Sequence, residues 1–311
     1  MTPRQVNDAK DFGRVAVLMG GSSAEKAISL KSGEAVFNAL QSQDINVVAI
    51  DVEDNPIDAL SDLKIDRVFN IIHGRGGEDG VLQAVLELIK IPYTGSEVLA
   101  SALAMDKLRT KLCWRGANLP TPDWFVLKND ADVAPCIEKI GFPMIVKPAL
   151  EGSSIGMSKA NTKDELKQAV LLASKYQSEV YAEAWVQGKE YTVAMLDGEM
   201  LPVIRLETPN EFYDFEAKYR SDNTLYHCPC GLSQNEEDDL MNLAKKACDV
   251  IGVKGWGRVD VFIDDTGNAQ LIEVNTVPGM TDHSLVPMAA KAKGMTFEAL
   301  VWRILETSFV K

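Results

Sequence analysis

In the first hundred residues, short apolar runs alternate with segments whose apolar residues recur at helical spacing. This pattern predicts strands at 15–19, 47–51 and 67–72 and amphipathic helices over 24–40 and 80–90. Strands that are separated by helices favour βαβ units and a parallel sheet. We therefore expect an α/β domain over residues 1–104.

The pattern changes near residue 105. Helices are predicted over 106–114 and 163–176, and strands at 124–127, 142–147 and 180–186. Shorter strands mixed with helices favour a small α+β domain, which we place at residues 105–187. The remaining residues, 188–311, are expected to form a third domain.

This third part begins with strands predicted at 192–196 and 201–206, followed by a long polar segment over 208–234 that is rich in aromatic and charged residues. The acidic run at 236–239 could be a cation site. However, Ser233 and Glu236 have capping-box spacing, and acidic residues are favoured in the first turn of a helix. A helix that begins here is the stronger interpretation.

Composition narrows the function classes. The 311 residues are 46% hydrophobic and 25% charged, which is ordinary for a globular protein, and the formal net charge is −13. That balance repels phosphate backbones, so we expect no nucleic-acid partner. We also expect no secretory signal, no membrane partner and a cytoplasmic location, because the N-terminus is polar and no apolar run could cross a bilayer.

The five cysteines are odd in number and widely spaced, which favours reduced thiols. Only His227-Cys228-Pro229-Cys230 is dense in possible metal ligands. Zinc would need a fourth ligand at suitable spacing, and none is near in the sequence. A loop that holds two thiols is the favoured interpretation.

A lysine at the end of a predicted strand precedes a Gly/Ser-rich loop. Lys147 is followed by Glu151-Gly-Ser-Ser154 and Gly156. Backbone N–H groups and hydroxyls of such a loop can hold phosphate groups. The Walker pattern is absent, and a simple turn is the alternative interpretation of the loop.

Two later segments carry the strongest chemical signal. Alternation places Arg258, Asp260 and Phe262 on one face of a strand, and Glu273 and Asn275 share a face of the next. A hairpin would bring Asp260, Glu273 and Asn275 together as oxygen ligands suited to Mg²⁺ that bridges substrate phosphates. A solvated strand face is the alternative.

These residues together resemble the ATP-grasp superfamily and, within it, the D-alanine–D-alanine ligase family. The resemblance covers almost the whole chain. It rests on Lys107, Lys147, 151–154, Arg258, Asp260, Glu273 and Asn275, with further family-like segments at 20–25, 73–80, 92–96, 105–107, 212–219, 275–281 and 283–285.

The resemblance implies an ATP-grasp fold, in which a Rossmann-like domain precedes two α+β domains that clamp ATP. It also implies ATP and two Mg²⁺ ions as cofactors, with Mn²⁺ as a substitute. Metal ligands would be Asp260, Glu273 and Asn275. ATP would contact Lys107, Lys147, Glu151, Ser153, Ser154, Glu183, Ala184, Trp185, Val186, Glu190, Lys218, Phe262 and Asn275.

The implied reaction joins two D-alanine molecules through an acylphosphate, for peptidoglycan precursor synthesis. Glu25 would bind the first substrate's ammonium, and Ser284 with Leu285 would bind the second substrate. Arg258 and the Gly279 N–H would stabilise the oxyanion. The remaining catalytic residues implied are Ser153, Lys218, Tyr219 and His73, with His73 on the substrate side.

The family also implies that segment 208–234 is a mobile lid that excludes water, and that the chain forms a homodimer. Tyr219 favours dipeptide over depsipeptide formation.

Another ATP-grasp ligase with a different acceptor is the same-class alternative. A nucleotide-binding oxidoreductase is disfavoured because Gly74-x-Gly76-Gly77 does not complete G-x-G-x-x-G, and a non-catalytic ATP-binding module would not need the full Arg258 to Asn275 set.

Overall fold

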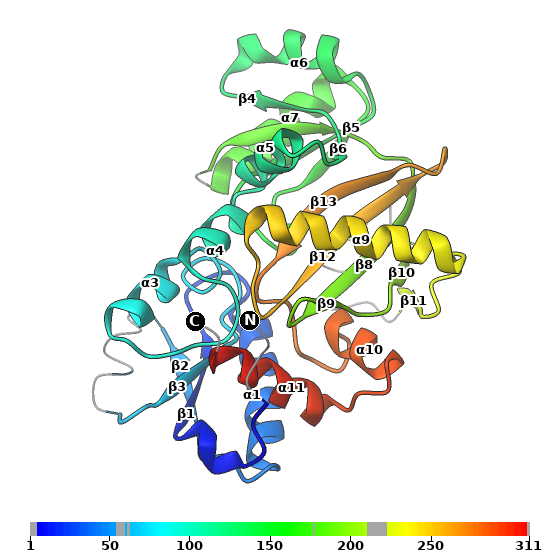
Figure 1. Cartoon of the computed structure of the whole chain (residues 1–311). Helices are drawn as coiled ribbons and strands as arrows, with labels where there is room; N and C mark the ends of the chain where they lie inside the picture. The colour runs from blue at the N-terminus through cyan, green and yellow to red at the C-terminus, as the bar shows by residue number, and fades with distance from the viewer. Residues whose placement is uncertain (1–4, 54–59, 61–62, 177, 210–222, 310–311) are drawn as a thin grey trace.

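The computed structural model describes residues 5–53, 60, 63–176, 178–209 and 223–309. Three β-sheets follow one another along this chain, and each is flanked by helices (Figure 1). The described part also contains 3₁₀ helices at Ala9–Phe12, Asp130–Asp132, Ser174–Tyr176 and Thr307–Phe309.

The N-terminal sheet is parallel and has the strand order β2-β1-β3. The predicted βαβ arrangement is therefore confirmed. All six residues of the central strand β1 are buried, as expected for a strand covered on both faces. The elements are β1 (Val15–Gly20), α1 (Lys26–Gln41), β2 (Val47–Val52), β3 (Arg67–Asn70), α3 (Val81–Leu88) and α4 (Val98–Met105).

The second sheet is antiparallel, in the order β4-β7-β5-β6, and stands at the top of Figure 1. Helix α5 leads into it and begins at a cap in which the Asp106 side chain accepts a hydrogen bond from the Arg109 N–H. The elements are α5 (Lys107–Gly116), β4 (Trp124–Leu127), α6 (Val133–Ile140), β5 (Met144–Pro148), β6 (Ser158–Ala160), α7 (Lys163–Ala173) and β7 (Val180–Ala184).

The third sheet has the order β11-β10-β8-β12-β13, with β9 paired to β8. Helix α9 lies across it (Figure 1). The elements are β8 (Gly188–Leu196), β9 (Glu199–Met200), β10 (Ile204–Glu207), β11 (Leu225–His227), α9 (Gln234–Ile251), β12 (Trp256–Asp264), β13 (Ala269–Asn275), α10 (Leu285–Ala292) and α11 (Phe297–Glu306).

The predicted start of helix α9 is confirmed. The Ser233 hydroxyl accepts a hydrogen bond from the Glu236 N–H, and the Glu236 carboxylate accepts one from the Ser233 N–H. The acidic run at 236–239 thus begins a helix. Gly252, in the left-handed conformation at φ 83°, ends it.

The prediction of one continuous loop over 208–234 is wrong for residues 225–227. These form β11, which pairs antiparallel with β10 and so acquires backbone hydrogen bonds that a loop would lack. Residues 210–222 lie outside the described residues. Helices α4, α6, α10 and α11 and the short strands β6 and β9 were also not predicted.

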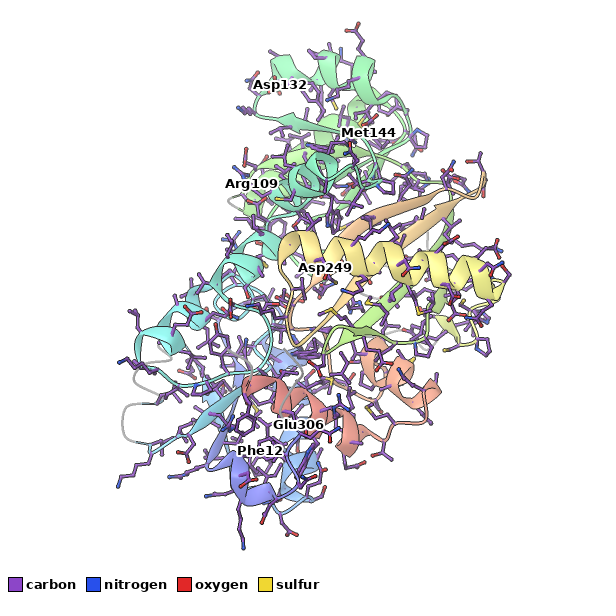
Figure 2. The ribbon with its side chains drawn as sticks, viewed as in Figure 1. Phe12, Arg109, Asp132, Met144, Asp249 and Glu306 are labelled. Carbon is purple, nitrogen blue, oxygen red and sulfur yellow. The ribbon has the colours of Figure 1, made fainter. Side chains whose placement is uncertain are left out.

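The N-terminal and C-terminal parts share one apolar core. Phe12 packs edge-to-face on Trp302 of α11, with ring centroids 4.9 Å apart, and the Val6 N–H donates to Glu306 at 2.8 Å. Figure 2 labels Phe12 and Glu306 close together at the base of the molecule. The C-terminal helix α11 therefore packs against the N-terminal end of the chain. The domain limits at 104 and 187 stay predictions.

No described helix is both long enough and apolar enough to cross a membrane.

Candidate active site

Most of the predicted nucleotide residues line one pocket between the second and third sheets, but Lys107, Glu151, Ser153 and Asn275 do not. Strands β5, β7 and β12 and the segment after β7 supply its walls. Of the predicted ATP residues, eight line it: Lys147, Ser154, Glu183, Ala184, Trp185, Val186, Glu190 and Phe262. Asp260 and Glu273 of the predicted metal set also line it, as do the apolar side chains of Ile145, Met157 and Ile272, which were not predicted.

A buried charge cluster lies at the base of this pocket. The Glu183 carboxylate pairs with the Lys147 ammonium at 3.1 Å and with the Lys111 ammonium at 2.6 Å. Lys111 also donates to the Thr121 hydroxyl at 2.6 Å, and that hydroxyl donates to the Leu271 carbonyl at 2.8 Å. The cluster therefore joins α5, the second sheet and β13.

Burial and ion pairing have opposite effects on the pKa values of Glu183 and Lys111 in this cluster. Burial alone would raise the pKa of Glu183, but Lys111 and Lys147 outweigh it and hold that pKa below its ordinary value. Burial lowers the pKa of Lys111 to about 8, although Glu183 opposes the shift. Two lysines share one carboxylate, so the cluster carries an excess positive charge beside the pocket.

The Gly/Ser loop is fixed by contacts from three directions. The Lys107 ammonium donates to the Glu151 carbonyl at 2.6 Å and lies 3.4 Å from the Glu273 carboxylate. Arg75 pairs with the Glu151 carboxylate at 3.0 Å and donates to the Tyr176 carbonyl at 3.1 Å. Burial raises the pKa of Glu151, and Arg75 opposes the shift.

The tip of this loop touches the N-terminal domain. The Ser153 hydroxyl donates to Glu25, and a Cβ on Gly152 would lie only 2.8 Å from a Glu25 oxygen. Ser153 and Ser154 have φ of 50° and 60°, in the left-handed region that side chains rarely adopt. Such backbone strain is kept where surrounding contacts enforce it, and it often marks a functional loop.

The predicted hairpin is formed by β12 and β13. Asp260 lies opposite Glu273, and Arg258 lies opposite Asn275. The register shifts after Asp260, so that Ile272 and Glu273 both line the nucleotide pocket. The guanidinium of Arg258 binds the Asp260 carboxylate at 2.8 and 2.7 Å.

The oxygen ligands predicted for Mg²⁺ are brought together. Asp260 accepts from the Thr192 hydroxyl at 2.6 Å and from the Asn275 amide nitrogen at 3.2 Å, which directs that amide's oxygen away from Asp260. Within the described residues, no three His, Cys, Asp or Glu side chains are grouped so that they could hold a metal ion. Two carboxylates and one amide oxygen are a donor set that fits Mg²⁺, which commonly takes its other ligands from phosphate oxygens and water.

A larger cavity of about 470 Å³ adjoins the hairpin on the side of the N-terminal domain. The predicted substrate and oxyanion residues Glu25, His73, Arg258, Gly279, Ser284 and Leu285 all line it, together with Ser153, Glu273 and Asn275. Glu273 lines both pockets, so they meet at this carboxylate. Sequence reasoning missed Lys31, Glu78, Thr224, Tyr226, Asp282 and Met288 in the cavity wall.

His73 links the N-terminal domain to the 277–280 turn. Its Nδ1 donates to the Val277 carbonyl at 2.9 Å, so Nε2 is unprotonated and accepts from the Ser32 hydroxyl at 3.2 Å. The Ser32 oxygen in turn accepts from the Met280 N–H at 3.2 Å. Burial lowers the pKa of His73, and both ring nitrogens are engaged, so its contact with substrate stays a prediction.

Ser284 and Gly279 form the far wall of the cavity. The Ser284 hydroxyl accepts from the Thr281 N–H at 2.8 Å, and a Cβ on Gly279 would approach that hydroxyl to 2.8 Å. Glycine is therefore the residue that leaves this corner open. Lys218 and Tyr219 lie outside the described residues, so their roles stay predictions.

The dense thiol segment is not a metal site in the described residues. His227 pairs with Glu207 at 3.0 Å, and Cys230 is buried in the core beneath α9. All five cysteines are free. The loop interpretation of this segment is wrong for His227, which ends strand β11.

Two family models match the chain: the D-ala D-ala ligase N-terminus at residues 56–96 and the D-ala D-ala ligase C-terminus at residues 113–306. The D-alanine--D-alanine ligase of Methylococcus capsulatus is 61% identical over 306 residues, which cover 98% of this chain and 99% of that protein.

Solved structures agree in fold. The D-alanine--D-alanine ligase of Bacillus anthracis complexed with ATP superposes with a TM-score of 0.81 at 32% identity, covering 95% of this chain and 96% of that one. The VanG D-Ala:D-Ser ligase of Enterococcus faecalis has a TM-score of 0.84 at 27% identity, covering 95% and 99%.

Proposed function

Because the chain belongs to the D-alanine–D-alanine ligase family, which has the ATP-grasp fold, we propose that it joins two D-alanine molecules at the expense of ATP. The product, D-alanyl-D-alanine, is a precursor of peptidoglycan. The observation that carries this proposal is the meeting of a nucleotide pocket and a substrate cavity at Glu273. A phosphoryl group can pass between them without leaving the site.

ATP binds in the pocket between the second and third sheets. Its adenine lies among the apolar side chains near Ala184–Val186, and Glu190 holds the ribose. Lys107, Lys147 and Lys218 contact the phosphates, and the loop at Glu151–Ser154 covers them. The excess positive charge of the Lys111–Glu183–Lys147 cluster supports this placement, since it favours a polyanion nearby.

Asp260, Glu273 and Asn275 would hold two Mg²⁺ ions, or Mn²⁺ in their place. When bound, these ions neutralise the charge on the phosphates. Arg258 is held against Asp260 by two hydrogen bonds, so the guanidinium is oriented before substrates arrive. Such preorganisation is the main source of catalysis in phosphoryl transfer.

The first D-alanine binds by its ammonium to Glu25, which Ser153 and Tyr219 orient. Its carboxylate receives the γ-phosphoryl group and becomes an acylphosphate. The second D-alanine binds through its carboxylate to Ser284 and the backbone at Leu285, and its amine attacks the acylphosphate. Arg258 and the Gly279 N–H stabilise the oxyanion of the tetrahedral intermediate.

His73 keeps this turn in position. It connects the N-terminal loop to Val277 and, through Ser32, to Met280, on either side of Gly279. The part of segment 208–234 that lies between β10 and β11 acts as a lid that excludes water from the acylphosphate.

The chain forms a homodimer through its N-terminal domain and acts in the cytoplasm, where free thiols such as these five persist. Exposed apolar side chains on α3 and α4 support the dimer: Val81, Leu88 and Leu99 are 57%, 82% and 70% exposed. Light scattering should give twice the chain mass of 34.1 kDa, and Leu88→Asp should halve the measured value.

The reaction is tested by phosphate release from Mg·ATP. We expect release that depends on D-alanine, and D-alanyl-D-alanine as the product. L-alanine and D-lactate should give little release. The D-Ala:D-Ser ligase among the structural relatives makes D-serine the informative second acceptor. Absence of D-alanine-dependent release would sink the proposal, and faster release with another acceptor would establish the alternative ligase.

A further inference from the structure

Glu78 lies on a Gly-rich loop that follows β3 and is held rigidly. The Gly77 carbonyl accepts hydrogen bonds from the Asn70 amide at 2.9 Å and from the Gln83 amide at 2.8 Å. A Cβ on Gly77 would lie 2.2 Å from the Ile72 carbonyl oxygen, so only glycine fits there. The residue before Glu78 is therefore fixed by contacts on both sides.

The Glu78 side chain is also oriented. One carboxyl oxygen, Oε2, accepts from the Gly74 N–H at 2.9 Å. The other oxygen, Oε1, makes no hydrogen bond to the residues that the structure describes. Glu78 lines the same cavity as Glu25, Arg258, Gly279 and Ser284. One oxygen thus holds the carboxyl in place, and the second is available to a ligand.

The proposed reaction, on which this inference rests, leaves one proton without an acceptor. The second amino acid arrives as an ammonium, which has no lone pair and cannot attack until it loses a proton. Arg258 and Lys107 are cations and cannot accept one. His73 has both nitrogens engaged, and Glu25 is bonded to Ser153 and assigned to the first substrate.

Three other titratable groups of the cavity, Lys31, Asp282 and His283, are exposed and lie at its rim. Asp282 and His283 have 87% and 70% of their side chains exposed to water, and Lys31 is a cation. A group in that position would exchange protons with solvent rather than with a substrate inside the cavity. Glu78 is the inner carboxyl that neither substrate anchoring nor metal binding uses.

We propose that Glu78 is the catalytic base that takes a proton from the ammonium of the second amino acid. The Glu78 carboxylate becomes a carboxylic acid, and the free amine forms the C–N bond to the acylphosphate carbon. The C–O bond to phosphate then breaks, and the second nitrogen proton leaves with the phosphate. No further reactant is required.

The electrostatics of the cavity support a sequence in which Glu78 becomes a base only after the first substrate has bound. Burial and, after it, the neighbouring Glu25 raise the pKa of Glu78 to about 8, whereas the hydrogen bond from Gly74 and the charges of Lys107 and Arg258 oppose the shift. An ammonium that binds Glu25 removes that repulsion. The first substrate therefore lowers the pKa of Glu78 and prepares the carboxylate for the second.

The test is Glu78→Gln, which keeps an oxygen for the Gly74 N–H but cannot take up a proton. Dipeptide synthesis should fall ~10²–10⁴-fold, the usual contribution of a general base. Hydroxylamine is already a neutral amine near pH 7. It should therefore trap the acylphosphate as D-alanine hydroxamate in the variant nearly as fast as in the wild type.

Three controls make the result decisive. Asp79→Asn alters the adjacent carboxylate, which bonds to backbone N–H groups of its own loop, and should keep dipeptide synthesis. Glu78→Asp retains a carboxyl and should restore part of the rate. The pH profile of dipeptide synthesis should lose its acidic limb in Glu78→Gln.

The possible failures are distinguishable. A wild-type enzyme that yields neither dipeptide nor hydroxamate refutes the proposed function itself. If the wild type makes both, near-normal dipeptide synthesis in Glu78→Gln overturns the role of Glu78. Equal loss of dipeptide and hydroxamate in that variant also overturns it, because the residue would then be structural.

Discussion

On the nucleotide side of Glu273, Lys111 and Lys147 share the carboxylate of Glu183 in a buried cluster with a positive excess. On the substrate side, the carboxyls of Glu25 and Glu78 both lie against Gly74, and burial together with Glu25 keeps a proton on Glu78 up to about pH 8. The first side encloses a narrow space of about 70 Å³ and the second about 470 Å³.

Each side thus presents groups that complement the charge of its ligand. A triphosphate is a polyanion and meets paired lysines, whereas amino acids bring ammonium groups and meet carboxyls. Fixed charges can stabilise a ligand in this way because the protein, not the ligand, bears the cost of placing them. Each side of the comparison can be altered separately.

The largest effect is expected from Lys111→Met, which breaks the nucleotide-side cluster. Glu183 would keep only Lys147, and removal of one partner from a buried pair costs about 3–5 kcal/mol. Denaturant unfolding should show this loss, and the KM for ATP should rise. Lys245→Met, in an exposed pair with Asp249, should change stability by less than about 1 kcal/mol. Equal stability of the two variants would contradict the importance of the cluster.

Glu273→Gln acts at the point where the two sides meet. Loss of a metal ligand and of charge should lower turnover about 10²–10³-fold, equivalent to several kcal/mol of transition-state stabilisation. A titration with Mg²⁺ should also shift to higher concentration. Asp265→Asn, an exposed carboxylate at the turn of the same hairpin, is the matched control. Wild-type turnover of Glu273→Gln at ordinary Mg²⁺ would refute the metal assignment.

Local patterns in the sequence were sufficient for part of this site. Strand alternation predicted that Asp260 and Glu273 come together in a hairpin, and capping-box spacing predicted the start of α9. Both depend on residues a few positions apart or on one hairpin. The same alternation could not reveal the register shift that turns Ile272 into the nucleotide pocket, because a bulge leaves no fixed residue signature.

Side-chain contacts between residues far apart in the chain could not be predicted from the sequence. Lys111 belongs to a polar-looking helix segment and has the appearance of a surface residue, yet it is fully buried because Glu183 and Thr121 lie opposite it. Glu183 was expected only as one of the residues that contact ATP. Glu78 was visible as an acid in a Gly-rich loop, but only its position in the cavity suggests a role.

The smallest effect, on stability alone, tests the substrate side. The pKa of Glu78 is about 8 in the folded protein and near the ordinary 4.5 in the unfolded chain. Between these pH values the folded state retains a proton that the unfolded state has released, so the free energy of unfolding should fall as pH rises from 4.5 to 8. Glu78→Gln cannot titrate and should escape this loss. Relative to the wild type, it should therefore gain at most a few kcal/mol between pH 5 and pH 8.

Thermal unfolding of both proteins at the two pH values, with Asp79→Asn as control, measures the difference. A difference that does not change with pH would mean that burial and Glu25 do not hold the proton on Glu78.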